Sequence, residues 1–385
     1  MILLLIASCT DETNNGKILN FKVKNNNKFN DIFELKEVYD IPSLLSQNIK
    51  LLGIDKIFAT PNGNFIIYDM NSGYLLLTTK KGDIIKIIGK KGKGPGEFAL
   101  LSDVIFTNEA KLYALDFIRQ EVLYYQDFEF VRNYKLSYVH RNPTQIIKIP
   151  NSKFIIAAER NLEDGASETR YRFLPYKEVN FLNIYDSNFV FRKSFLKPDE
   201  RLIETEGVLT RVRLTTFVPS CLIEDKIIST TQEGLYNLYI HDLDGNLINE
   251  FSIVQENFKY LDLNLINEYN LNKNNFNNDL ETIGKIMASY SAPISIFNLN
   301  GILLITILEP YDNYFPMFST NELNLHEYHL DIFKYKNDNL FPMIGGIAIN
   351  KKIIGVADGE YLYMIDKKYE ENKEIIRIYK YKLKL

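Results

Sequence analysis

The clearest clue to the architecture of this chain is the segment Gly89-Lys90-Lys91-Gly92-Lys93-Gly94-Pro95-Gly96-Glu97-Phe98. Four glycines and a proline within ten residues indicate backbone conformations that other residues avoid. An apolar strand at 83–88 precedes the segment, and a new apolar run begins at Leu100. We therefore interpret Gly94, Pro95, Gly96 and Glu97 as a structural junction between two repeats of an all-β array, with Glu97 accepting backbone N–H groups.

Apolar runs separated by polar turns recur along the rest of the chain. Alternating apolar strands joined by a short polar turn indicate β-hairpins. We expect six outer hairpins, which span 74–88, 122–134, 181–195, 238–253, 330–339 and 361–381. Two inner strands precede each hairpin: 54–58 with 65–68, 104–106 with 111–115, 145–149 with 154–158, 220–223 with 226–230, 294–297 with 301–307, and 346–349 with 352–357. A strand-rich solenoid is the alternative, but four short antiparallel strands per repeat favour the blades of a β-propeller.

One segment departs from this rhythm. Within residues 258–291, Asn278 and Glu281 have the spacing of a capping box, and four apolar residues share one helical face: Leu280, Ile283, Met287 and Tyr290. The predicted fold is therefore an all-β, six-bladed β-propeller with one helical insertion at about 258–291. We expect a truncated signal and lipobox at 1–8, a flexible tether at 9–30 and the propeller at 31–385.

Composition limits the class of protein. The chain has 385 residues, of which 46% are hydrophobic and 24% charged, as expected of a globular protein with a sizeable core. A net charge of −4, with Lys and Arg spread along the sequence, argues against nucleic acid as a partner. Only two cysteines occur, and Cys221 lies in an apolar run where we expect it to be buried. We expect a monomer.

The N-terminus carries a second signal. A short apolar run ends in Ile6-Ala7-Ser8-Cys9, and polar residues follow at once. This tetrapeptide resembles the lipobox of bacterial lipoproteins, in which the cysteine is diacylated, and two acyl chains suffice for stable anchoring. We predict lipid attachment at Cys9 and an outer-membrane lipoprotein of the cell envelope, on the periplasmic side or the cell surface. An exposed N-terminal β segment with an incidental cysteine remains the alternative.

Taken together, these features resemble the six-bladed β-propeller lipoproteins of Bacteroidetes-type bacteria. The resemblance is carried by the junction Lys93-Gly94-Pro95-Gly96-Glu97-Phe98, by the repeated strands Phe65-Ile66-Ile67-Tyr68-Asp69 and Lys111-Leu112-Tyr113-Ala114-Leu115-Asp116, and by Cys9. It covers the first two blades closely and the others through their rhythm. It implies the propeller architecture and an envelope location, and it implies no particular chemistry.

No candidate motif for binding a metal or a cofactor is complete in this sequence. The glycine-rich junction lacks the Lys-Ser/Thr pair of a phosphate loop. The run Asp242–Asn246 resembles the start of a calcium loop, but Ile253 stands where the final Glu should be. His326 and His329 face opposite sides of a predicted strand. We expect neither a metal nor a cofactor, and we interpret Asp69 and Asp116 as turn-forming residues that cap backbone groups.

Polar loops suggest where a ligand binds. Loops at one face of a scaffold usually build its binding surface, and Arg suits carboxylate or sulfate groups. We therefore predict that loops 159–180 and 201–216 bind a glycan, a peptide or an envelope protein, through Arg160, Arg170, Arg172, Arg211 and Arg213. The alternative is an enzyme, a propeller hydrolase, lyase or lactonase with its site at the central channel. The sequence contains no pattern that names catalytic residues, and a binding module is favoured.

Overall fold

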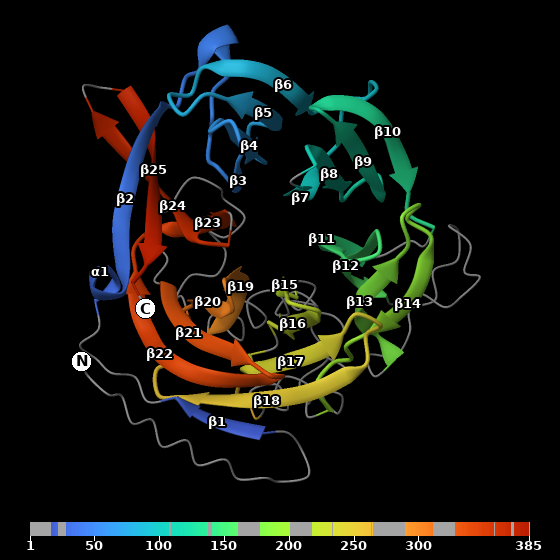
Figure 1. Cartoon of the computed structure of the whole chain (residues 1–385), viewed down its shortest axis with the longest axis vertical. Helices are drawn as coiled ribbons and strands as arrows, with labels where there is room; N and C mark the ends of the chain where they lie inside the picture. The colour runs from blue at the N-terminus through green and yellow to red at the C-terminus, as the bar shows by residue number, and fades with distance from the viewer. Residues whose placement is uncertain are drawn as a thin grey trace, which may run out of the picture.

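Six sheets of mainly antiparallel strands stand radially around one axis (Figure 1). The computed structural model describes residues 17–21, 28–107, 109–137, 141–160, 178–200, 218–232, 234–262, 264, 289–310, 328–357, 359–370 and 373–384. Each sheet is one blade, and the strands of a blade are named below in order from the axis outwards. In the described part of the chain, no helix is long and apolar enough to cross a membrane.

The first three blades follow the chain in order. Blade 1 contains β3 (Lys56–Ala59), β4 (Phe65–Asp69), β5 (Tyr74–Thr78) and β6 (Ile84–Lys90). Blade 2 contains β7 (Leu101–Phe106), β8 (Lys111–Asp116), β9 (Glu121–Gln126) and β10 (Glu129–Lys135). Blade 3 contains β11 (Arg141–Ile149), β12 (Lys153–Arg160), β13 (Asn180–Tyr185) and β14 (Phe191–Phe195). The predicted strand pairs of these blades are present with small differences at their ends.

The next two blades repeat the pattern. Blade 4 contains β15 (Ser220–Ile223), β16 (Lys226–Thr230), β17 (Asn237–Asp242) and β18 (Leu247–Gln255). Blade 5 contains β19 (Ala292–Leu299), β20 (Ile302–Leu308), β21 (Tyr328–Lys336) and β22 (Asn339–Ile349). The helical pattern expected at 258–291 falls largely on residues outside the described part of the chain.

Blade 6 differs from the prediction, because an N-terminal strand completes it. Its order from the axis is β23 (Lys352–Ala357), β24 (Tyr361–Glu370), β25 (Lys373–Leu383) and β2 (Phe33–Pro42). Strand β2 pairs antiparallel with β25 from Phe33 opposite Leu383 to Pro42 opposite Ile375. The ring is therefore closed by pairing the two ends of the propeller, and 361–381 is a middle hairpin of the blade and not its outer one.

The prediction of an inner strand at 346–349 was wrong for a local reason. Strand β22 runs on through Ile349 as the outer strand of blade 5. Glycine usually interrupts a strand, but here Gly345 and Gly346 lie in a bulge, where the register of β22 shifts against β21. Gly346 has a φ of +67°, a value that glycine adopts without strain.

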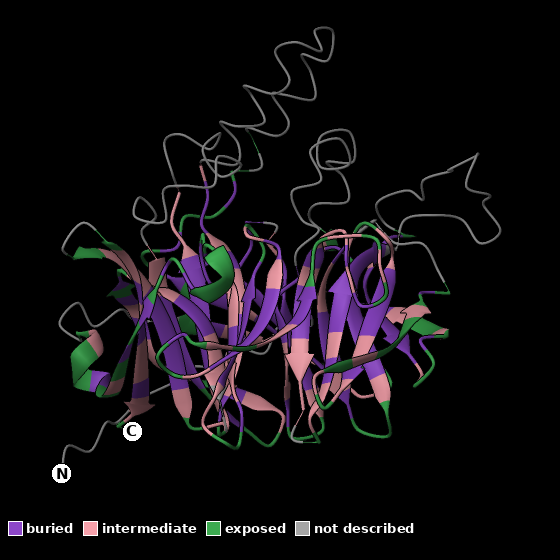
Figure 2. Ribbon diagram, turned by 90° about the horizontal axis from the view of Figure 1, so that it is seen from above, coloured by how far each residue is buried: buried purple, intermediate pink, exposed green. Residues whose placement is uncertain are grey.

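The core lies between the blades and not inside any one of them. Six clusters of buried apolar side chains each combine residues of two neighbouring blades. Strand β4 is buried at every position because its two faces pack on different blades, which explains its continuous apolar sequence. When the propeller is seen edge-on, buried residues occupy the middle of the sheets and exposed residues lie mainly at the two flat faces of the propeller (Figure 2).

The connections between strands lie at two opposite faces of the propeller, and the direction of each strand decides at which face its connections lie. Because successive strands are antiparallel, the connections from the second to the third strand of a blade lie on the same face as those between blades. Hydrogen bonds agree: Lys91 N–H donates to Gly73 O across two such connections. We call this the long-connection face, since the β12–β13, β14–β15, β18–β19 and β20–β21 connections emerge there. The opposite side is the hairpin face.

The N-terminal segment lies against the outside of the ring. Strand β1 (Lys17–Phe21) pairs parallel with β18 of blade 4, and α1 (Phe29–Ile32) leads into β2. Residues 17–21 fall within the segment 9–30 that was expected to be a flexible tether, so this part of it is a strand of the fold. Residues 1–16 and 22–27, with Cys9 among them, lie outside the described residues.

The closure predicts unequal effects for two substitutions in β2. Ile41 is fully buried between blades 6 and 1, whereas Val38 on the same strand is exposed. We expect Ile41→Ala to lower the free energy of unfolding by about 2–5 kcal/mol, as large-to-small core changes do. Val38→Ala should lower it by less than about 1 kcal/mol. Urea unfolding measures both, and equal effects would show that β2 does not complete the core.

Candidate functional site

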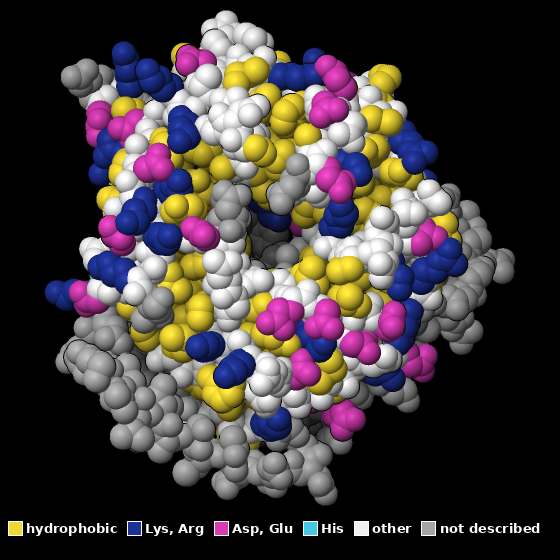
Figure 3. All heavy atoms as spheres, viewed as in Figure 1, with side chains coloured by type: hydrophobic (Ala, Val, Ile, Leu, Met, Phe, Trp, Pro, Cys, Tyr) yellow, Lys and Arg dark blue, Asp and Glu magenta, His cyan; other side chains and the backbone are white. Residues whose placement is uncertain are grey.

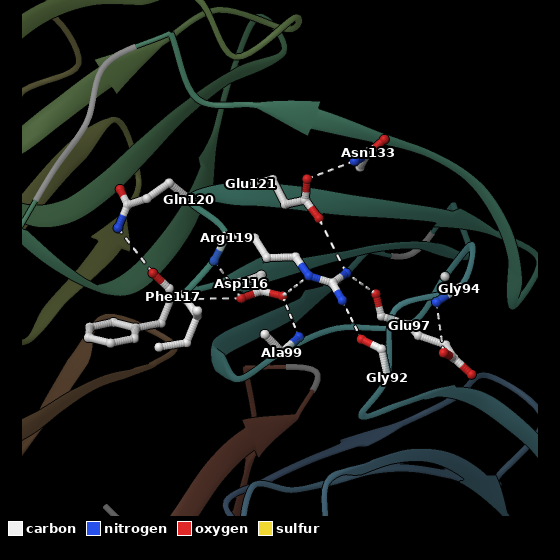
Figure 4. Close-up of polar contacts among 12 residues, drawn as sticks. Gly92, Gly94, Glu97, Ala99, Asp116, Phe117, Arg119, Gln120, Glu121 and Asn133 are labelled. Carbon is white, nitrogen blue, oxygen red and sulfur yellow. Dashed lines mark hydrogen bonds and ion pairs between the residues drawn. The ribbon is translucent and has the colours of Figure 1, made fainter. Parts of the chain in front are cut away.

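The glycine-rich junction connects β6 of blade 1 to β7 of blade 2 (Figure 4). Residues Gly94 to Glu97 form a turn in which Glu97 N–H donates to Gly94 O at 3.0 Å. Pro95 takes the second position, and Gly96 takes the third with a φ of +72°, as a type II turn requires. The expected backbone hydrogen bond to the Glu97 carboxylate is present, with Gly94 N–H at 2.8 Å from Oε2, and it lowers the pKa of that carboxyl.

Arg119 holds this junction to blade 2. It lies in the β8–β9 turn, and its guanidinium donates to Glu97 O at 2.6 Å and to Gly92 O (Figure 4). Tyr125 on β9 donates its hydroxyl proton to Gly96 O at 2.9 Å. Every one of these acceptors is a backbone carbonyl of the junction. The described contacts therefore serve to fix one blade against the next.

Asp69 and Asp116 have the same role in blades 1 and 2. Each is fully buried at the end of a second strand and accepts backbone N–H groups. Asp69 Oδ2 accepts from Leu52 at 2.6 Å, and Asp116 Oδ2 accepts from Ala99 at 2.7 Å. Their Oδ1 atoms accept from the following turns. The interpretation of both as backbone-capping residues is confirmed.

Polar side chains also join the inner strands around the channel. Figure 3 shows one face hollowed at its centre, with charged side chains at the edge of the hollow. Asp103 on β7 pairs with Lys56 of blade 1 and accepts from Ile146 N–H of blade 3 at 2.9 Å. Further contacts link the other blades: Lys352 with Asp55 at 3.0 Å, Gln145 with both backbone groups of Ser220, and Asn298 with Leu222 O.

These contacts give the described channel residues a structural role. Both carboxylates of the ring, Asp55 and Asp103, have a lysine ammonium as partner. The amides of Gln145 and Asn298 are bonded to backbone groups of the neighbouring inner strand. These side chains form hydrogen bonds and ion pairs with the neighbouring inner strands, and in this way they connect the blades around the channel.

The structure describes the side chain of none of the five predicted ligand-binding arginines. Arg160 ends β12, where its backbone is paired with Asn180, and its side chain lies outside the described part of the structure. Arg170, Arg172, Arg211 and Arg213 lie outside the described residues altogether. The strands that flank them do place both connections, β12–β13 and β14–β15, on the long-connection face.

A buried polar cluster lies between blades 4 and 5, and it was not predicted from the sequence. Asp331 on β21 accepts from Tyr236 Oη at 2.8 Å, from Gln255 Nε2 at 2.9 Å and from Gly346 N–H at 2.9 Å. The first two donors belong to blade 4, and the third is in the bulge of β22. Burial raises the pKa of Asp331 to about 6.

A second polar pair stands next to this carboxyl, near the long-connection face. His329, two residues before Asp331 on β21, has its Nδ1 2.9 Å from Glu309 Oε1. The other oxygen of Glu309 accepts from Ser291 Oγ at 3.4 Å. Ser291 Oγ contacts the carboxylate and also accepts from Lys259 N–H at 3.0 Å. This geometry can hold or transfer a proton, but among the described contacts Ser291 is not bonded to the imidazole as an activated nucleophile would be. His326 lies outside the described residues.

These features define the class of protein: a six-bladed β-propeller closed by an N-terminal strand. The chain belongs to the family described as 6-bladed beta-propeller (DUF5128), whose model matches residues 8–207. That match covers more than half of the chain and includes blades 1 to 3. The predicted fold class is confirmed, and so is the resemblance at the level of a six-bladed propeller family. A comparison with curated proteins finds no match.

Solved structures repeat the architecture. The chain is similar to an inferred exported protein from Bacteroides fragilis, at 15% identity over 94% of this chain and 99% of that one, with a TM-score of 0.60. It is also similar to a member of the DUF4221 family from Bacteroides vulgatus, at 12% identity over 91% of this chain and 98% of that one, with a TM-score of 0.57. At such identities the similarity shows the fold alone.

The junction makes a testable contribution to stability. Arg119→Met removes two charge-assisted hydrogen bonds and leaves the carbonyls of Gly92 and Glu97 without those donors. We expect the free energy of unfolding to fall by about 1–3 kcal/mol. Lys93→Met, at an exposed position of the same loop, is the matched control and should cost less than about 0.5 kcal/mol. Chemical denaturation compares the two, and indistinguishable values would remove Arg119 from the junction.

Asp331 predicts a pH dependence of stability. Its pKa of about 6 in the folded protein is above the unfolded value of about 3.9, so its contribution is complete below pH 4 and is lost as the pH rises through 6. The loss is on the order of 3 kcal/mol. Asp331→Asn cannot ionise, so its stability relative to the wild type should increase between pH 4 and pH 7. Denaturant unfolding at both pH values measures this, and an equal stability difference between variant and wild type at the two pH values would contradict it.

Proposed function

We propose that this protein is a lipid-anchored binding module of the cell envelope. Its ligand, a glycan, a peptide or an envelope protein, binds at the long-connection face. The anchor is a diacylated Cys9, and the protein acts as a monomer at the outer membrane. The lipobox-like sequence Ile6-Ala7-Ser8-Cys9 and the similarity to a Bacteroides protein inferred to be exported support the location.

The observation that carries the proposal is the distribution of the connections. The described residues that flank the four longest connections all lie at one face: Arg160 and Glu178, Glu200 and Val218, Asn264 and Ser289, Pro310 and Tyr328. Hairpins at the opposite face are short turns, such as Asn151–Ser152 and Asp127–Phe128. Binding residues concentrate on loops that a rigid scaffold positions. The presence of the four longest connections at one face therefore supports a binding site there.

A second candidate function is supported by the polar cluster between blades 4 and 5. Hydrolases, lyases and lactonases need a proton donor or acceptor with a shifted pKa, and Asp331 has one. His329 and Glu309 lie beside it, near the long-connection face. This observation favours a site between these two blades over one at the central channel. A binding module still fits better, because Asp331 is fully buried and its described partners already occupy both of its oxygens.

Removal of the arginines tests the binding proposal. A glycan array with sulfated and carboxylated oligosaccharides serves as the probe. We expect the wild type to bind at least one anionic glycan. The variants Arg160→Ala/Arg170→Ala/Arg172→Ala and Arg211→Ala/Arg213→Ala should each lose about tenfold or more in affinity, since a charge-assisted hydrogen bond contributes about 1.5–3 kcal/mol.

A matched variant on the hairpin face separates this site from general charge effects. Lys153, Arg192 and Lys193 lie in the hairpins of blade 3 on that face, and their triple change to Ala removes as many cations. It should leave glycan binding unchanged. Equal losses in both sets, or none in either, would count against a ligand site at the long-connection face.

A further inference from the structure

We propose that the outer edge of blades 4 and 5 is the side of the propeller that faces the membrane, and that strand β1 holds it there. The partner is a lipid surface. The inference rests on the lipid anchor of the proposed function and adds to it the orientation of the propeller. It starts from the position of β1, which lies outside β18 at the rim (Figure 1).

Strand β1 is an integral part of the rim of blade 4. Its five residues pair with β18 in register, from Lys17 opposite Phe251 to Phe21 opposite Gln255. Leu19 is buried in the cluster between blades 4 and 5, next to Phe251 and Ile253. Lys17 Nζ donates to Asn339 Oδ1 of blade 5 at 2.9 Å. Backbone pairing, a buried leucine and a polar contact thus attach β1 to two blades.

This attachment shortens the chain between the anchor and the fold. Cys9 and Lys17 are eight residues apart, so a fully extended chain reaches at most about 27 Å from the lipid to the rim of blade 4. Without β1, the first contact would be α1 at Phe29, and the same estimate gives about 68 Å. A propeller on the longer chain could turn any side to the membrane. The shorter chain favours the side that carries β1.

The surface beside β1 is suited to contact with lipid. Four large apolar side chains are exposed on the outer strands of these two blades: Leu247 at 55%, Ile248 at 36%, Val254 at 48% and Phe341 at 47%. The outer strands of blades 1 and 2 expose one each, Ile85 and Val131, blade 3 exposes Val190 in the turn before its outer strand, and the outer strand of blade 6 exposes Leu35 and Val38. Exposed apolar groups mark surfaces that bind partners or membranes, and three of these four lie on β18 of blade 4, more than any other outer strand exposes among the described residues. Here they flank the segment that leads to the anchor.

Such an orientation agrees with the proposed ligand site. With the rim of blades 4 and 5 against the bilayer, the axis of the propeller lies along the membrane plane. The long-connection face and the hairpin face then both stand free of the lipid. A large ligand can reach the long-connection face from the side.

Tryptophan fluorescence tests the orientation, because the chain contains no Trp. We would place a single probe at the rim of blade 5, Phe341→Trp, or at the rim of blade 2, Val131→Trp, two positions of similar exposure. The lipidated full-length protein is reconstituted in vesicles of phosphatidylethanolamine and phosphatidylglycerol with brominated acyl chains, which quench Trp on contact. We expect quenching several-fold stronger for Phe341→Trp than for Val131→Trp.

A second change shows whether β1 causes the difference. Leu19→Asp places a charge in the buried cluster and should detach β1, so the two probes should then be quenched alike. Asn20→Asp adds the same charge at an exposed position of β1 and should preserve the difference. Mass spectrometry of the N-terminus accompanies both. A lipidated protein with equal quenching at the two probes overturns this inference alone, whereas an unmodified Cys9 overturns the proposed anchor and the inference together.

Discussion

Pairing between β2 and β25 is the constraint on which the rest of the structure depends. It joins residues about 340 positions apart, such as Ile41 and Ile376, and completes blade 6. Each apolar cluster lies between two blades. If the ring were open, the apolar residues of one such cluster would be exposed to water on both blades that form it. Strand β2 contributes to two of these interfaces, with Tyr39 and Ile41 facing blade 1 and Phe33 facing blade 5. Loss of the closing strand therefore weakens two interfaces at once.

The polar contacts follow from this arrangement. Where two blades meet, backbone groups at the ends of inner strands and connections lack a partner within their own sheet, and a buried unpaired group is costly. Asp69 and Asp116 accept such N–H groups at the connections, and Asp103 does so at the inner edge. Asp331 makes the same kind of contact with three neutral donors, and burial raises the pKa of this carboxyl to about 6.

Local signals decided how much could be predicted from the sequence. Turns such as Gly94-Pro95-Gly96-Glu97 and buried strands such as Phe65–Asp69 are encoded by adjacent residues, and these were predicted correctly. Strand β2 was missed because its partner is at the other end of the chain, and the bulge at Gly345–Gly346 was misread because glycine there absorbs a shift in register. The cluster of Asp331 was missed for a similar reason: Tyr236 and Gln255 are 95 and 76 residues away from it.

A closed ring also lets the fold satisfy its own apolar and polar groups. The blades bury their apolar residues against one another, and the inner edges are satisfied by side chains of the ring itself. The described ends of the β18–β19 connection also contribute to this core, with Phe258, Leu261 and Tyr290 buried in its clusters. The N-terminal segment provides both the strand that closes the ring and the strand that covers the rim of blade 4. One N-terminal segment therefore takes part in two separate pairings, one with the last strand of the chain and one with the outer strand of blade 4.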